Sequence, residues 1–106
     1  MPEDVTAASR QPHEEMLSMV AFAQTIGNML ELDLAALGVA AGTSLASDWA
    51  LDSLQMLEMA LAIEELSDSL VSEDEAMALD TLADAYSLYS RLWVASNESK
   101  LAGGRA

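Results

Sequence analysis

The chain has 106 residues, a formal net charge of −14 and 52% hydrophobic residues, which suit one domain with a modest core. It has no cysteine, so disulfides, zinc–thiolate sites and cysteine nucleophiles are excluded. No run of about 18 or more apolar residues occurs, and the acidic start lacks the features of a secretory signal, so we expect a cytoplasmic protein without membrane partners.

The acidic residues are concentrated in one long stretch of the chain. Residues 11–90 hold fifteen acids and neither lysine nor arginine; the four basic residues are Arg10, Arg91, Lys100 and Arg105. Such a surface repels nucleic acid and anionic membranes, whereas basic protein patches are attracted to it. We therefore expect protein partners with basic patches and no nucleic-acid partner.

The N-terminal part of the chain predicts an arm and then a helix. Residues 1–12 contain both prolines and no apolar periodicity, which predicts a flexible arm. From Glu14 to Leu32 apolar residues recur at steps of three and four, which predicts a helix that continues through Gly27. Its apolar stripe is Met16, Met19, Val20, Ala23, Ile26, Met29 and Leu30.

Residues 33–52 predict a long loop, because glycine, serine and threonine punctuate them. Loops of this length are uncommon in compact domains and are usually functional when they occur. Six apolar side chains are expected to attach the loop to the core: Leu34, Leu37, Val39, Leu45, Trp49 and Leu51.

A second helix is predicted to begin at Asp52 or Ser53, since Asp52 and Gln55 have the spacing of a capping box. Apolar residues lie on two of its faces. The first stripe is Met56, Met59, Ala60 and Ile63, and the second is Leu54, Leu57 and Leu61. A helix on one side of a small bundle needs only one apolar stripe, and acids rim the second, which predicts a docking surface.

The C-terminal half predicts two more helices. Residues 67–72 form a polar connector that Leu70 and Val71 anchor, and 73–79 form a short helix. Asp80 or Thr81 caps a last helix whose buried stripe is Leu82, Ala85, Tyr86, Tyr89 and Trp93. After Val94 the composition predicts a disordered tail.

The expected fold is therefore all-α: a small four-helix bundle of three longer helices and one short one, with a long loop after the first. We expect a flexible arm over 1–12, the folded domain over 13–94 and a flexible tail over 95–106.

At this point the sequence resembles the acyl carrier protein family, from about Glu14 to Val94. The stretch 45–54, Leu-Ala-Ser-Asp-Trp-Ala-Leu-Asp-Ser-Leu, resembles the family's approach to its modified serine. Leu57, Glu58 and residues 62–65 resemble its recognition helix. Residues 71–76 and 79–85 resemble its third helix and the start of its fourth.

The resemblance implies that Ser53 carries a 4′-phosphopantetheine arm, added from coenzyme A by a phosphopantetheinyl transferase that Asp52 helps to bind. The arm's thiol would hold an acyl group as a thioester, so the protein would be a substrate and shuttle without catalytic groups or metal of its own. We expect a monomer.

The resemblance also assigns roles to the two faces of the second helix. Partner enzymes that transfer, condense or tailor acyl groups would dock through basic patches onto Leu54, Gln55, Leu57, Glu58, Leu61, Glu64 and Glu65. An acyl chain could be sheltered beside Met56, Met59, Ala60 and Ile63, although plain core packing explains those residues equally well.

The chain departs from the family's usual pattern at three positions. Ala50 stands where glycine is frequent, Gln55 where an acid is frequent, and the bulkier Trp49 where leucine is usual. These departures leave a polyketide or other specialised pathway as open as fatty-acid biosynthesis.

A second hypothesis from another class is an acidic helical adaptor, in which Ser53 is only a helix cap and the leucine face binds a partner without covalent modification. A calcium sensor does not fit, because the acids lack the spacing of a calcium loop. An enzyme is disfavoured, since the only histidine, His13, lies beside Pro12 in the N-terminal flank.

Overall fold

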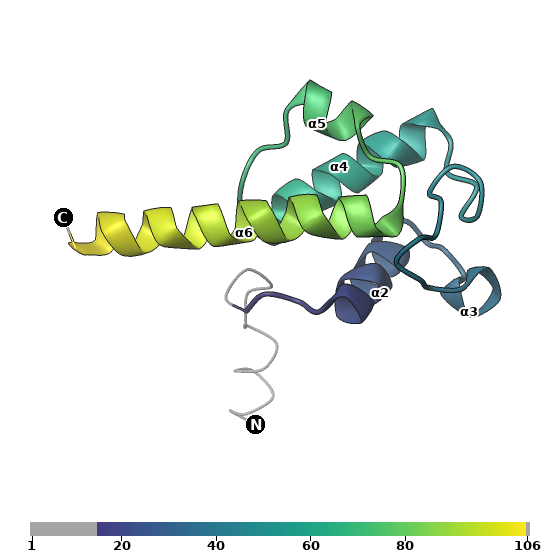
Figure 1. Ribbon diagram of the computed structural model, residues 1–106, viewed down its shortest axis with the longest axis horizontal. Coiled ribbons are helices and arrows are strands. Elements are labelled where there is room, and N and C mark those ends of the chain that lie inside the picture. The colour runs from purple at the N-terminus through teal and green to yellow at the C-terminus, as the bar shows by residue number, and fades with distance from the viewer. Residues whose placement is uncertain (1–14, 106) are drawn as a thin grey trace.

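The computed structural model describes the backbone of residues 15–105 and the side chains of residues 15–98. Figure 1 shows its helices: α2 (Met19–Met29), α3 (Leu34–Leu37), α4 (Ser53–Ser67), α5 (Glu73–Met77) and α6 (Leu82–Arg105). Within 15–105 no strand forms, and a single antiparallel bridge joins Ser44 to Thr81. The expectation of an all-α fold is confirmed. The predicted arm and His13 lie outside the described residues.

The core lies where α2, α4 and α6 meet. Helix α4 packs most extensively on α6, α2 contacts both, and α5 lies against α4 (Figure 1). Burial of apolar side chains from these elements is the main favourable term for folding. The fully buried large side chains are Phe22, Ile26, Leu45, Met59, Ile63, Leu66, Leu82 and Tyr89.

An aromatic cluster ties α2 and the segment before it to α6. The Phe22 ring stacks on Tyr89 at a centroid distance of 5.0 Å and meets Tyr86 edge-on at 5.5 Å. The Tyr89 hydroxyl accepts a hydrogen bond from the Leu17 N–H at 2.9 Å, and the Tyr86 hydroxyl donates to the Leu17 carbonyl at 2.7 Å. Burial raises the pKa of Tyr89, so its neutral form is favoured in the fold.

Helix α2 begins later than predicted, at Met19, because the Ser18 hydroxyl accepts from the Ala21 N–H and caps it. Of the apolar residues whose spacing predicted the helix, Ala23, Ile26 and Leu30 are buried, whereas Met16, Val20 and Met29 are exposed. The missed core residue is Phe22. Periodicity alone did not show which of the two overlapping apolar faces of α2 is buried.

The predicted loop 33–52 contains the short helix α3, which Asp33 caps. Leu45, Trp49 and Leu51 are buried as expected, whereas Leu37 and Val39 are exposed and do not anchor the loop. Within the loop, the Trp49 indole N–H donates to the Gly38 carbonyl at 2.9 Å and so links Gly38 to a buried side chain.

The loop is fixed to the start of α6 through the backbone. The Leu45 N–H donates to the Asp80 carbonyl, and the Leu82 N–H donates to the Thr43 carbonyl, each at 2.9 Å. Thr81 caps α6, because its hydroxyl accepts from the Asp84 N–H. The loop segment 43–45, which precedes α4, is therefore hydrogen-bonded to residues 80–82 at the start of α6.

The connector after α4 differs from the prediction. Ser67 ends α4, Asp68 takes a left-handed conformation, and Leu70 is exposed rather than anchoring. Val71 is half-buried against the core. The short helix α5 ends at Met77, earlier than expected.

Beyond Val94, where the sequence predicted a disordered tail, the described backbone is helical: α6 continues to Arg105 and projects beyond the other helices (Figure 1). The Ser96 hydroxyl donates to the Asp68 carbonyl, and the Asn97 side-chain amide donates to the Trp93 carbonyl. Extending an existing helix costs far less than starting one, so the packed part of α6 carries the next turns.

Candidate functional site

Asp52, and not Ser53, caps the N-terminus of α4. The Asp52 carboxylate accepts from the Gln55 N–H at 2.8 Å, and the Gln55 side chain accepts from the Asp52 N–H at 3.1 Å. Ser53 is the first helical residue, its side chain is exposed, and its hydroxyl makes no hydrogen bond to any described residue. The predicted capping box is confirmed, and the Ser53 hydroxyl is left without a hydrogen bond to the described residues.

Ala50, which precedes this capping box, has a φ of 54°. The left-handed region costs an L-residue with a Cβ about 1–2 kcal/mol. The Leu51 N–H donates to the Leu45 carbonyl at 3.0 Å, which turns the chain toward α4. The alanine that departs from the family pattern is therefore a point of backbone strain.

Ala50→Gly is expected to stabilise the protein by about 0.5–1 kcal/mol, because glycine relieves the strain but adds unfolded-state entropy. The midpoint of urea unfolding, followed by circular dichroism, measures the effect. Ala46→Gly is the control, since Ala46 is exposed in the same loop without a positive φ and should lose stability. Equal losses of stability in Ala50→Gly and Ala46→Gly would show that Ala50 is not a point of backbone strain.

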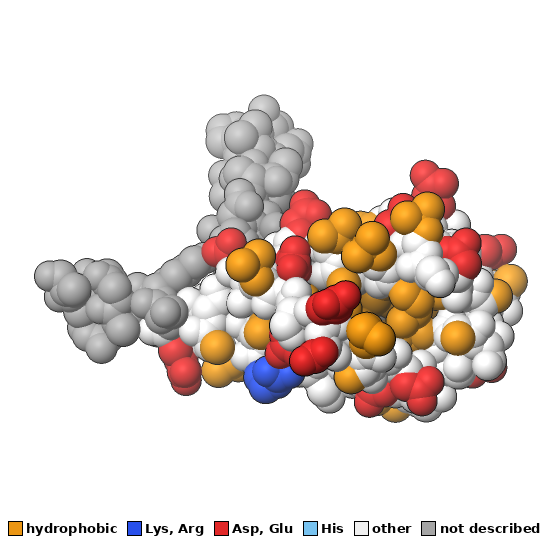
Figure 2. All heavy atoms as spheres, turned by 90° about the horizontal axis from the view of Figure 1, so that it is seen from above, with side chains coloured by type: hydrophobic (Ala, Val, Ile, Leu, Met, Phe, Trp, Pro, Cys, Tyr) orange, Lys and Arg blue, Asp and Glu red, His pale blue; other side chains and the backbone are white. Residues whose placement is uncertain are grey.

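The outer face of α4 exposes the second leucine stripe. Leu54, Leu57 and Leu61 are 63%, 55% and 54% exposed, and Glu58 and Glu65 beside them are exposed acids. Figure 2 shows hydrophobic side chains gathered, with acids among them, on the side of the molecule that carries α4 and α5. An apolar centre with charged edges is the usual anatomy of a docking surface.

The predicted inner stripe of α4 divides into two groups. Met59 and Ile63 are fully buried in the core, so they pack and do not line an open space. Met56 is half-buried, and Met56 and Ala60 line a groove beside α5.

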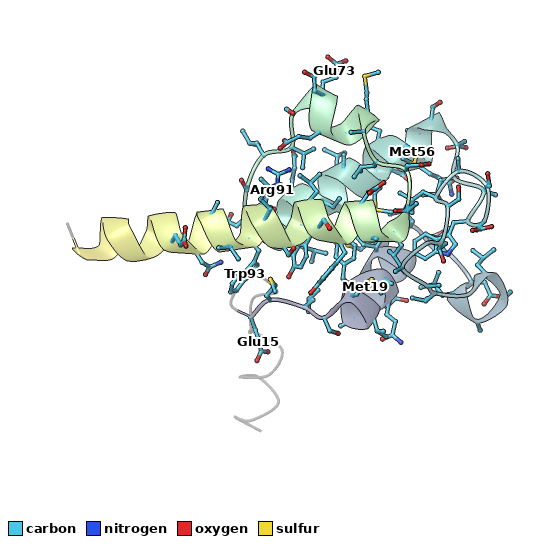
Figure 3. The ribbon with its side chains drawn as sticks, in the orientation of Figure 1. Glu15, Met19, Met56, Glu73, Arg91 and Trp93 are labelled. Carbon is cyan, nitrogen blue, oxygen red and sulfur yellow. The ribbon has the colours of Figure 1, made fainter. Side chains whose placement is uncertain are left out.

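This groove, of about 650 Å³, lies between α4 and α5. Figure 3 labels Met56 on its α4 wall and Glu73 on its α5 wall. Ser53 lines the same groove, and most of the other lining residues are apolar. The lining residues are Ser53, Met56, Leu57, Ala60, Leu61, Glu64, Val71, Ser72, Glu73, Ala76 and Met77.

The α5 wall is fixed by its own capping box. The Ser72 hydroxyl accepts from the Glu75 N–H at 3.1 Å, and the Glu75 carboxylate accepts from the Ser72 N–H at 2.9 Å. The Ser72 N–H lowers the pKa of Glu75, with smaller contributions from the Ser72 hydroxyl and from Arg91, whose guanidinium lies 3.2 Å away. Helix α5 is thereby attached to α6.

The residues that form the α5 wall of the groove were not predicted from the sequence. Ala76 and Met77 were not assigned to the site, although the spacing of Ser72 and Glu75 does indicate a capping box there. Glu64 was placed on the docking surface, but its carboxylate accepts from the Val71 N–H at 2.8 Å. Gln55 was also placed on the docking surface, but it is half-buried and its side chain accepts from the Asp52 N–H in the cap.

The described residues contain no group of three or more histidine, cysteine or acidic side chains arranged to hold a metal ion. Among the described helices, none is long and apolar enough to cross a membrane. Comparison with known proteins adds no further constraint, since no family model and no curated protein matches this chain.

Proposed function

We propose that this chain is an acyl carrier protein that holds acyl intermediates as thioesters on a 4′-phosphopantetheine arm at Ser53. The observation that carries the proposal is the Ser53 hydroxyl, which is exposed, free of hydrogen bonds to described residues and open to an apolar groove. Because Asp52 serves as the cap, modification of Ser53 would leave the helix cap intact.

The position of Ser53 suits a phosphate ester. The first N–H groups of a helix lack intrahelical acceptors, and the helix dipole places partial positive charge there. A phosphodiester on Ser53 would be stabilised by both. The phosphopantetheine thiol supplies the thioester chemistry that a chain without cysteine lacks.

Partner enzymes would dock on the outer face of α4. Leu54, Leu57 and Leu61 offer apolar contact, and Glu58 and Glu65 select basic patches. The transferase would use Asp52 beside the serine, while acyl-transferring, condensing or tailoring enzymes would use the same face in turn. The pathway is polyketide, other specialised or fatty-acid biosynthesis, and the carrier works as a cytoplasmic monomer.

The second candidate is the acidic adaptor, which the exposed leucine face also favours. That hypothesis gives Ser53 the role of a helix cap. Since Asp52 accepts the capping hydrogen bond, the adaptor leaves the exposed serine without a role, and we favour the carrier.

The test is incubation with coenzyme A, Mg²⁺ and a broadly tolerant phosphopantetheinyl transferase, followed by intact mass measurement. We expect the mass of one phosphopantetheine to be added to the parent protein and none to Ser53→Ala. Ser69→Ala is the matched control, because Ser69 lies near the other end of α4 and outside the groove; it should be modified like the parent. Absence of modification with several transferases would leave the adaptor as the better hypothesis.

A further inference from the structure

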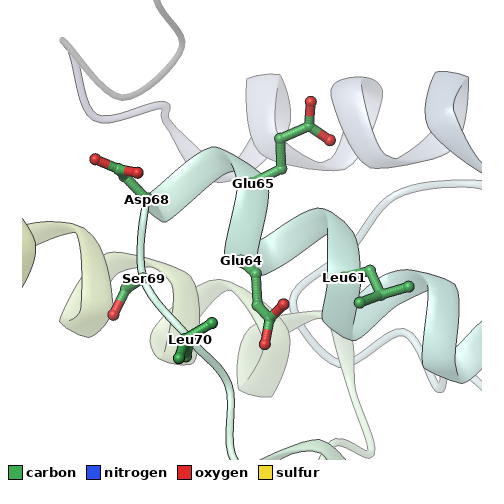
Figure 4. A pocket seen from close by; sticks show the side chains of 6 residues that line it. All are labelled: Leu61, Glu64, Glu65, Asp68, Ser69 and Leu70. Atoms are coloured by element: carbon green, nitrogen blue, oxygen red, sulfur yellow. The ribbon is translucent and has the colours of Figure 1, made fainter.

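Three residues other than glycine take the left-handed conformation in the part of the chain that the structure describes: Glu31, Ala50 and Asp68. Two of them follow a helix. Glu31 comes directly after the C-cap of α2, and Figure 4 shows Asp68 at the turn where α4 ends. A left-handed residue is common there, because it helps to satisfy the last carbonyl groups of a helix. Ala50 differs from both, because it leads into a helix: α4 begins three positions later.

Both neighbours of Ala50 are anchored. Trp49 is buried and its indole N–H donates a hydrogen bond within the loop, while Leu51 is buried and its N–H donates to an earlier loop carbonyl. Ala50 itself is exposed, so packing of its methyl group does not explain its conformation. The turn is imposed by the anchors on either side. Asp52 and Ser53 follow at once, so this turn sets the direction in which the chain enters α4.

Alanine and glycine differ in how far the backbone can move at such a turn. For a residue with a Cβ the left-handed region is a small area of φ and ψ, whereas glycine also populates the regions around it. Alanine at position 50 therefore strains the turn and at the same time restricts it. Strained residues persist next to functional sites where the strain holds the site in one geometry.

We infer that Ala50 is a positioning residue, which holds Asp52 and Ser53 in the geometry that the phosphopantetheinyl transferase binds. The transferase enters through the proposed function, whereas the restriction of the backbone does not depend on it. A serine that is already ordered loses less conformational entropy when the carrier docks. Ala50→Gly moves that loss to the docking step and leaves the chemical step unchanged.

The first test is the kinetics of phosphopantetheine transfer from coenzyme A to the full chain, followed by intact mass at several carrier concentrations. We expect Ala50→Gly to raise KM for the carrier about two- to fivefold, the backbone freedom of glycine relative to alanine expressed as a ratio, and to keep kcat. A loss of folded protein does not explain such a result, because the same substitution is expected to raise the stability of the fold.

Two further variants separate restriction from strain. Asparagine adopts the left-handed conformation readily but keeps a Cβ, so Ala50→Asn should stabilise the protein and keep the parent KM. Ala46→Gly is the matched control, because Ala46 is exposed in the same loop without a positive φ. It should lose stability and also keep the parent KM.

Backbone ¹⁵N relaxation supplies a second readout that needs no transferase. In the parent protein the order parameters of residues 51–54 should lie near about 0.85, the value of rigid backbone. Ala50→Gly should lower them, whereas Ala50→Asn and Ala46→Gly should leave them unchanged.

Equal KM values for the parent and Ala50→Gly, equal rises of KM in Ala50→Gly and Ala50→Asn, or order parameters that Ala50→Gly does not lower would overturn the inference. The two readouts also separate it from the proposed function. If no transferase modifies Ser53 and the order parameters fall in Ala50→Gly alone, the carrier function fails while the restriction by Ala50 stands. If Ser53 is modified and KM does not change, only the positioning role fails.

Discussion

Trp49→Ala is expected to lower the free energy of unfolding by about 3–5 kcal/mol, the usual cost of truncating a buried large aromatic side chain. Trp49 is 2% exposed, and its indole N–H donates to the Gly38 carbonyl at 2.9 Å. The substitution leaves a cavity and an unsatisfied carbonyl under the loop that leads into α4. Urea unfolding, followed by circular dichroism, measures the loss.

The second tryptophan provides the control. The Trp93 indole N–H is buried but has no acceptor among the described residues, so Trp93→Phe removes no hydrogen bond. Trp49→Phe should cost about 1–2 kcal/mol for the lost hydrogen bond, and Trp93→Phe should cost less. Equal losses for the two phenylalanine variants, or a loss below about 1 kcal/mol for Trp49→Ala, would show that the loop is not held through Trp49.

Features that depend on neighbours in the sequence were predictable. The capping box of Asp52 and Gln55 requires two side chains three residues apart, and both hydrogen bonds form as expected. The exposed stripe of Leu54, Leu57 and Leu61 follows from helical spacing and from the acids beside it. Such patterns predict the structure correctly because the contacts that define them are between residues close in the sequence.

Features that depend on distant contacts were not predictable. Phe22 is buried because it meets Tyr86 and Tyr89, more than sixty positions along the chain, and a single apolar residue among several carries no signal of that. The helical turns after Val94 and the exposure of Leu70 likewise depend on how α6 and the connector pack.

The candidate site shows the same division. The sequence indicated Ser53 and both faces of α4, but a groove needs a second wall, and α5 supplies it through Ala76 and Met77. The orientation of the Glu64 side chain was not predicted either, because its carboxylate accepts from the Val71 N–H across the turn after α4. The exposed and buried faces of one helix can be predicted from periodicity, whereas a groove between two helices cannot.

Glu58→Lys is expected to slow association with the phosphopantetheinyl transferase about tenfold at low salt, since reversing one charge near a basic patch removes an attraction and adds a repulsion. Glu58 is exposed on α4 between the exposed Leu57 and Leu61. The fold should be unaffected, because the Glu58 side chain makes no hydrogen bond or ion pair with a described residue. Association rates measured by stopped flow at several salt concentrations give the effect.

Glu31→Lys makes the same change of charge away from α4. Glu31 is exposed between α2 and α3, and its φ of 59° suits lysine no less than glutamate. Its association rate should fall much less than that of Glu58→Lys, and the two rates should converge at about 1 M salt, where screening acts over about 3 Å. Equal slowing by both variants would mean that net charge alone governs the encounter, and the partner surface would then have to be sought away from Leu57 and Leu61.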